Sequence, residues 1–235
     1  MKKLVMSLLM TFGIFTMVSA DIGLKIGVSA SLGEMETSGQ EKNKTTSEIN
    51  KSKNAEQALF GKGSYFIEKD LAFLPGFLGR IGSRVSIGYD NIVHDLDLGS
   101  QRNVRNVSLG TLAVPVTPAT THSLDAKITG FETVYATLNI TDWLYLKTGT
   151  VTVDVDTNFV GSATSTYAKK HSLDGNVIGF GVEKSSDNGL FFRLEYNDYT
   201  IDGKTVQNTG TDSVFEAKLN DVTGETGTIS IGKAF

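Results

Sequence analysis

Residues 225–235 read ETGTISIGKAF and end the chain on an aromatic side chain. Ile229 and Ile231 alternate with small or polar residues in this stretch. Because successive side chains of a β-strand point to opposite faces, the stretch predicts a strand with one apolar face and one small or polar face. Phe235 ends this strand on the apolar side.

The first twenty residues have the three parts of an export signal. Lys2 and Lys3 precede an apolar run over residues 4–18, and Val18-Ser19-Ala20 matches the small-residue rule for cleavage. The run is shorter than the roughly 20 residues that a spanning helix needs. We therefore expect a cleavable signal peptide over 1–20 and a mature chain over 21–235, with Asp21 as its first residue.

Composition narrows the class of the mature chain. Without Lys2 and Lys3 it carries 20 basic and 26 acidic residues, a net charge of −6, which argues against a nucleic-acid partner. An exported chain without cysteine must be stabilised by something other than disulfides, and a continuous ring of strand hydrogen bonds would do this.

Alternation of apolar and polar residues recurs along the rest of the chain. In the first stretch, after Asp21, it holds for twelve residues, which is more than a tilted strand needs to cross a bilayer. We expect eight strands, at residues 21–33, 57–70, 80–95, 123–140, 143–157, 174–184, 190–201 and 213–235.

The connections between these strands alternate in length. Residues 34–56, 96–122, 158–171 and 202–212 are long and polar, whereas residues 71–79, 139–142 and 185–189 are short. Residues 34–56 contain so few apolar side chains that we expect a mobile loop. Long external loops and short periplasmic turns are typical of an outer-membrane barrel.

Two local features refine this interpretation. In the stretch 143–157 the apolar positions change phase between Leu146 and Val151, which predicts a β-bulge near residues 147–149. Several aromatic residues fall near the short connections and predict a girdle at one membrane interface. These aromatic residues are Phe73, Phe77, Trp143, Phe191 and Phe235.

Together, the export signal, the strand pattern and the terminal Phe235 resemble the small eight-stranded outer-membrane barrels of Gram-negative bacteria, the OmpA-like and OmpX-like class. The resemblance implies an all-β, eight-stranded, antiparallel up-and-down transmembrane barrel in the bacterial outer membrane, in contact with outer-membrane lipids and lipopolysaccharide. It also implies that Ile229, Ile231 and Phe235 form the signal read by the outer-membrane assembly machinery. Lys233 departs from the family, which usually has an apolar residue there.

Charged residues on the second face of the strands indicate what fills the bore. We expect them to face the interior and to pair across it, because lone buried ions are costly. They are Lys25, Arg84, Glu183, Arg193 and Glu195. A periplasmic lipocalin-like barrel, with its apolar face inside, is the alternative; the connection lengths and Phe235 favour the membrane barrel.

Three functions are compatible with this fold. The first is a structural or surface-interaction barrel whose external loops meet an extracellular ligand or phage. The second is a narrow porin-like channel for small solutes, and the third a lipid-modifying enzyme suggested only by the dipeptide His122-Ser123. The sequence identifies no catalytic residue and no cofactor; His94, Asp95 and Asp97 either bind a divalent ion at the rim or are solvated loop residues.

Overall fold

The computed structural model describes residues 22–44, 49–76, 81–105, 120–160, 167–210 and 215–235. The predicted signal peptide and Phe77 lie outside these residues. Within them, no helix is long and apolar enough to cross a membrane.

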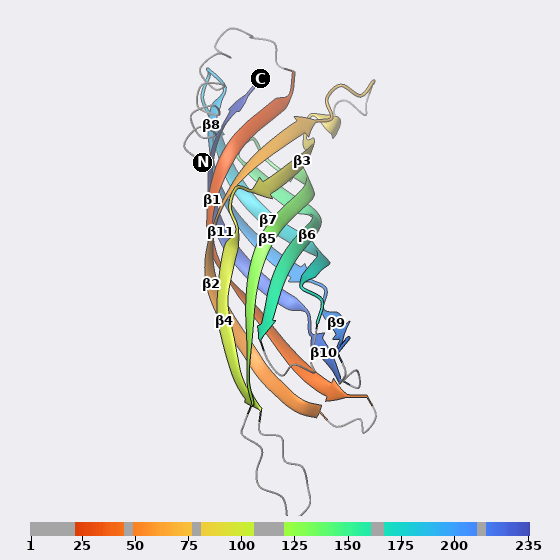
Figure 1. Ribbon diagram of the computed structural model, residues 1–235. Helices are drawn as coiled ribbons and strands as arrows, with labels where there is room; N and C mark the ends of the chain where they lie inside the picture. Colours follow the sequence, from red (N-terminus) through yellow and green to blue (C-terminus); the bar gives the residue numbers. More distant parts are fainter. Residues whose placement is uncertain (1–21, 45–48, 77–80, 106–119, 161–166, 211–214) are drawn as a thin grey trace, which may run out of the picture.

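One antiparallel sheet closes on itself to form a barrel (Figure 1). Around the ring the paired strands follow the order β1-β2-β3-β5-β6-β7-β8-β11, and β11 pairs with β1 to complete it. The strands are β1 (Leu24–Asn43), β2 (Ile49–Asp70), β3 (Val85–Ile92), β4 (Leu96–Arg105), β5 (Thr120–Asn139), β6 (Leu144–Val160), β7 (Lys170–Ser185), β8 (Leu190–Ile201), β9 (Lys204–Gln207), β10 (Phe215–Leu219) and β11 (Val222–Ala234).

These strands build eight wall segments. β3 and β4 both pair with β5, and β10 and β11 both pair with β1, so each of these pairs forms a single interrupted segment. β9 likewise continues β8 along the β10–β11 segment. The prediction of an all-β, eight-stranded, antiparallel up-and-down barrel is confirmed.

The register of the pairing fixes the shape of the barrel. Following paired residues once around the ring leads from Lys25 on β1 back to Met35 on the same strand, a stagger of ten residues. With strands about 4.8 Å apart and a rise of about 3.3 Å per residue, this stagger over eight strands requires a tilt of about 40°. A barrel of this size has a bore that side chains can fill.

Two of the predicted long loops contain paired strand residues. β1 and β2 continue as a paired hairpin to Asn43 and from Ile49, and β4 pairs with the first half of β5. The prediction of a mobile loop over 34–56 is therefore wrong. Polar composition limits burial, but it does not prevent two adjacent segments from satisfying each other's backbone groups.

The β-bulge predicted near residues 147–149 is also wrong. β6 pairs with β7 in unbroken register from Leu144 to Asp156, and the irregularity lies in β5, between Ile128 and Gly130. Val151 and Val153 are buried on the same face as Tyr145. The apolar positions therefore change phase in the sequence because the apolar side chains lie on the outer face of the wall in the first part of β6 and on the inner face in the next part.

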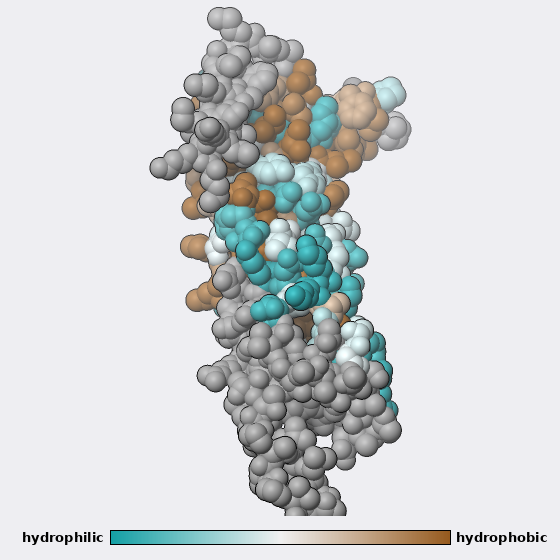
Figure 2. Space-filling view, in the orientation of Figure 1, coloured by the Kyte–Doolittle hydropathy of each residue, from teal (hydrophilic) through white to brown (hydrophobic). Residues whose placement is uncertain are grey.

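This change divides the barrel into two halves. We call the part toward the short turns the inner half and the part toward the long hairpins the outer half. On β8, the outward residues from Leu190 to Tyr196 are apolar or aromatic, and then Asp198 and Thr200 follow. Figure 2 shows the same division, with hydrophobic surface gathered toward the inner half and hydrophilic surface next to it.

The two described chain ends meet at the inner end of the barrel (Figure 1). The backbone oxygen of Phe235 accepts hydrogen bonds from the amides of Ile22 and Leu24, at 2.9 and 3.2 Å. The amide of Phe235 donates to the oxygen of Leu24 at 2.8 Å. Phe235 therefore completes the ring, while its role as an assembly signal with Ile229 and Ile231 stays a prediction.

Candidate functional site: the filled bore of the barrel

Aromatic rings fill the space above inward-facing glycines. In four places a glycine is paired across two strands with a Phe or Tyr whose ring lies where the glycine's side chain would be. The pairs are Gly27 with Phe66, Gly88 with Tyr135, Gly181 with Tyr145, and Gly232 with Phe191. These glycines therefore do not widen the bore.

Phe191 corrects the predicted girdle. Its side chain is 2% exposed and lies inside the barrel, 6.1 Å from the ring of Phe66. Phe73 and Trp143 are exposed at the inner end, as a girdle requires. The error arises because both faces of β8 carry aromatic or apolar residues at this point, so the sequence alone did not separate them.

Arg193 lies at the centre of an ion-pair network across the inner half. Its guanidinium donates to both carboxylate oxygens of Glu68, at 2.5 and 2.9 Å, and to Glu183 at 2.6 Å. Lys25 donates to the same Glu183 at 2.6 Å. Because these residues come from β1, β2, β7 and β8, the network joins opposite sides of the wall.

A second set of contacts extends this network toward the middle of the barrel. Glu195 accepts hydrogen bonds from Lys147, Tyr145 and Asn197 at 2.7–2.8 Å. The ring of Tyr145 also lies 4.9 Å from the Arg193 guanidinium, which connects the two sets. With Lys25, Glu68 and Glu183, the network contains three cations and three carboxylates.

Of the five charges predicted to lie inside, the structure brings four into this network. Lys25, Glu183, Arg193 and Glu195 are among its members. The prediction for Arg84 is wrong, because Arg84 is exposed in the turn before β3. Residue parity on the assumed strand 80–95 had placed it inside, but β3 begins only at Val85.

Sequence reasoning missed Glu68 and Lys147. Both are less than 10% exposed and carry direct ion pairs. Lys147 was hidden by the assumed β-bulge, and unbroken alternation through β6 would have placed it inside with Tyr145. For Glu68, apolar and polar residues do not alternate clearly over residues 57–70, so the sequence does not assign its face.

A layer of polar residues lies next to the network, on the side of the outer half. Asp90 accepts a hydrogen bond from Ser64 at 2.8 Å, and Ser31 is bonded to Thr228 at 2.8 Å. Lys62 lies between this layer and the outer half, with its ammonium 4.2 Å from the centre of the Phe131 ring. The layer encloses a polar cavity with room for about one water molecule.

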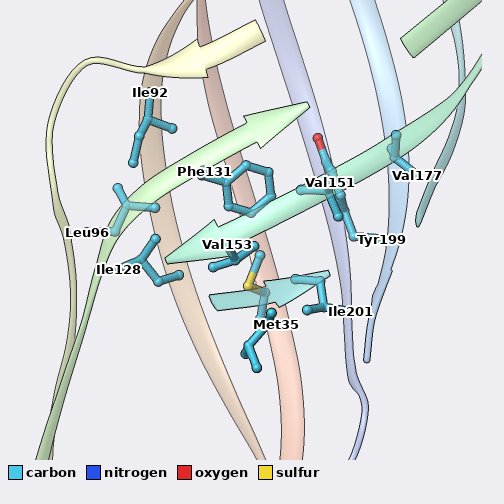
Figure 3. Packing of buried hydrophobic residues seen from close by; sticks show 11 residues of the cluster. Met35, Ile92, Leu96, Ile128, Phe131, Val151, Val153, Val177, Tyr199 and Ile201 are labelled. Carbon is cyan, nitrogen blue, oxygen red and sulfur yellow. The ribbon is translucent and has the colours of Figure 1, made fainter. Parts of the chain in front are cut away.

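An apolar cluster fills the outer half (Figure 3). Phe131 is completely buried and packs edge-on against Tyr199, with ring centres 5.4 Å apart. The cluster consists of Met35, Ile92, Leu96, Ile128, Phe131, Val151, Val153, Leu173, Val177, Tyr199 and Ile201. The outer half is thus built like a water-soluble barrel, with apolar residues inside and polar residues outside.

At the rim, His94 and Asp95 make other contacts, and the side chain of Asp97 lies outside the described ones, so the metal site considered from the sequence stays a hypothesis. Both ring nitrogens of His94 contact backbone groups, with Nε2 accepting from Gly63 at 3.1 Å and Nδ1 lying 3.0 Å from the oxygen of Asp95. The Asp95 carboxylate pairs with Lys127 at 2.6 Å. In the described ranges, no three His, Asp or Glu side chains are grouped so that they could hold a metal ion.

No protein-family model and no characterised protein sequence matches the chain. Among solved structures it is similar to Ail, the attachment invasion locus protein of Yersinia pestis, at 9% identity and a TM-score of 0.41, covering 90% of this chain and 98% of that one. It is also similar to the outer membrane protease OmpT from Escherichia coli, at 7% identity and a TM-score of 0.42, covering 94% and 100%. A FadL homologue of Pseudomonas aeruginosa matches at 6% identity and a TM-score of 0.34, covering 91% and 90%.

The class of the protein follows from its own geometry. Only a helix or a closed barrel satisfies every backbone group within a bilayer, and this barrel is closed by the β11–β1 pairing. Its inner half exposes a belt of apolar and aromatic side chains on β5, β7, β8 and β11. The chain is a transmembrane β-barrel of the outer-membrane type.

Proposed function

We propose that this protein is a closed outer-membrane barrel whose role is structural or surface-interacting, with the outer half and its hairpins presented to the exterior. The observation that carries this proposal is the filling of the bore at two successive levels. The ion-pair network occupies the inner half, and the apolar cluster occupies the outer half.

The two levels oppose solute passage for different reasons. A polar solute or hydrated ion would have to displace paired charges such as Arg193 and Glu68, which are less than 5% exposed. It would then have to enter the apolar cluster around Phe131 without hydrogen-bond partners. A narrow porin-like channel would need an open polar path through both.

The outer hairpins support a surface role. The β1–β2 hairpin and the β4–β5 hairpin are paired, and they extend from the end of the barrel opposite the chain ends (Figure 1). Their backbone is held by strand pairing, so a partner would meet a preformed surface and would pay little ordering entropy. An extracellular ligand or a phage protein is the class of partner that such a surface fits.

Planar-bilayer recordings of the refolded protein test the proposal. We expect the wild type and the exposed-site control Lys170→Ala to insert without steady conductance steps. A variant with Arg193→Ala and Phe131→Ala opens both levels and should give transient steps, which shows that the assay detects a bore of this size. Steady steps in the wild type would contradict the proposal and favour the narrow channel.

A further inference from the structure

The connection between β2 and β3 differs from the other turns at the inner end. It runs over residues 71–84, whereas the β5–β6 and β7–β8 connections occupy only residues 140–143 and 186–189. The parts of it that the structure describes project sideways from the barrel wall near the two chain ends (Figure 1). We call its described parts, residues 71–76 and 81–84, the inner arm.

Hydrogen bonds give the base of the inner arm a definite shape. The amide of Leu71 donates to the oxygens of Gly82 and Val85, at 3.1 and 3.0 Å. Gly82 packs against the backbone of Leu71 so closely that a side chain there would overlap it. The oxygen of Arg84 accepts from the amide of Asn139 at 2.8 Å, which ties the arm to the end of β5.

Two large apolar side chains of the inner arm are exposed. Phe73 is 66% exposed and Ile81 is 54% exposed. Ile140 and Trp143, in the connection that follows β5, are also exposed at this end of the barrel. Figure 2 shows hydrophobic surface on the arm and on the adjoining wall. The arm therefore extends the apolar belt of the inner half beyond the barrel itself.

Cationic groups accompany these apolar side chains. The ammonium of Lys69 lies 5.1 Å from the centre of the Phe73 ring and 2.9 Å from the carboxylate of Asp70. Arg84 is exposed, and among the described residues it has no ion pair. An apolar surface edged by Lys and Arg is the pattern of a segment that lies in a membrane interface, with its cations at the level of the lipid phosphates.

We propose that the inner arm is a lipid-binding element in the leaflet on the side of the chain ends. Phe73 and Ile81 enter the upper acyl region, and Arg84 binds the phosphates of anionic phospholipids. Continuity with the apolar belt places the arm at the bilayer surface, and the Arg84 cation selects lipids with net negative charge. The proposal requires only that the barrel spans the membrane, so it is independent of whether the bore is closed.

Depth-dependent quenching tests where the arm lies. Trp143→Phe removes the one native tryptophan, and Phe73→Trp then places a single indole probe on the arm. In vesicles of phosphatidylcholine with spin-labelled lipid, we expect most of the emission of this arm probe to be quenched and its maximum to shift to the blue. The control variant carries Asp187→Trp on the polar β7–β8 turn and should be quenched only by aqueous iodide.

Lipid selectivity tests the charge part of the proposal. Energy transfer from the arm probe to labelled phosphatidylglycerol should exceed transfer to labelled phosphatidylcholine several-fold. Arg84→Gln should remove most of this preference, whereas Lys170→Gln, at an exposed site on β7, should leave it unchanged. Each variant is first checked for heat-modifiable migration, which shows that the barrel is folded.

Three results would overturn the proposal. Emission of the arm probe that is quenched by iodide and not by lipid would place the arm in water, as a periplasmic protein partner would require. Lipid quenching with no preference for phosphatidylglycerol, or with a preference that survives Arg84→Gln, would show that Arg84 does not select anionic phospholipids. Quenching that appears only at high protein-to-lipid ratios would point to a second copy of the chain.

Discussion

The inner and outer halves of this barrel direct apolar side chains to opposite faces of the wall. On β7, the inner half directs Phe180 and Val182 outward and Gly181 and Glu183 inward. Toward the outer half of the same strand, Asp174 points outward and Leu173 inward. The backbone continues through this reversal in one register, paired on both sides.

The comparison shows that the surroundings, and not the fold, decide which face of a strand is apolar. In the bilayer, lipid takes up the apolar face, so the bore can hold charges provided that they pair. Beyond the bilayer, water takes up the polar face, and the bore becomes an apolar core of the usual kind. Buried ion pairs stabilise the inner half, and apolar packing stabilises the outer half.

The largest expected effect is the loss of Arg193 in the inner half. Arg193→Ala leaves Glu68 and Glu183 without their shared partner in a site closed to bulk water. We expect the free energy of unfolding to fall by about 3–5 kcal/mol, as when one member of a buried pair is removed. Urea unfolding in lipid vesicles, followed by tryptophan fluorescence, measures this change.

Lys170→Ala is the control, because it removes a cation from an exposed site on β7. Its free energy of unfolding should stay within about 0.5 kcal/mol of the wild type. Equal losses in the two variants would show that the inner half does not depend on its buried ion pairs, and the contrast between the halves would lose its electrostatic basis.

A smaller effect is expected from adding a charge to the outside of each half. Phe180→Arg puts a cation into the apolar belt on β7, which should cost about 2–4 kcal/mol near the bilayer midplane. Asn176→Arg, four residues away on the same face, lies beyond the belt and should cost about 0–1 kcal/mol. The same vesicle-based unfolding assay compares them, and similar costs at both positions would place the bilayer boundary elsewhere.

Much of this architecture could be predicted from the sequence because alternation is strong where lipid contacts one face. β8 lies at residues 190–201, as predicted, and its outward face is apolar in the belt and polar beyond it. The hairpins were missed because most of their residues are polar on both faces, so the sequence shows no alternation of apolar and polar residues there. The β-bulge in β6 was predicted wrongly because the apolar side chains were assumed to face lipid along the whole strand. In the structure, the apolar side chains change from the outer to the inner face without a change of register.

The interior could be predicted only in part. Arg193 and Glu195 lie in a strand of clear phase and were placed correctly inside, whereas Glu68 and Lys147 depended on the phase of less regular stretches. Sequence spacing also could not show which carboxylate each cation meets, because the partners lie on strands brought together by the stagger of the whole ring. The link between Arg193 and Glu68 joins residues 125 positions apart in the chain.

The smallest expected effect concerns how the inner half fits aromatic rings over glycines. The Tyr145 ring covers Gly181, and its hydroxyl donates to Glu195 at 2.7 Å, so the glycine holds the ring where the network needs it. Gly181→Ala would overlap that ring and force it to move, and we expect a loss of about 1–3 kcal/mol in the free energy of unfolding, as for other overpacked sites.

Gly227→Ala is the control for this prediction, because a methyl group there meets no atom within 4 Å. Gly227 lies on the outward face of β11, and the substitution should be neutral or slightly stabilising, since alanine loses less backbone entropy than glycine on folding. If both alanine variants unfold at the wild-type urea midpoint, the ring of Tyr145 can move without cost. The position of Glu195 would then be set by Lys147 and Asn197 alone, and the inner half would tolerate changes in packing that the outer half, built around Phe131, does not.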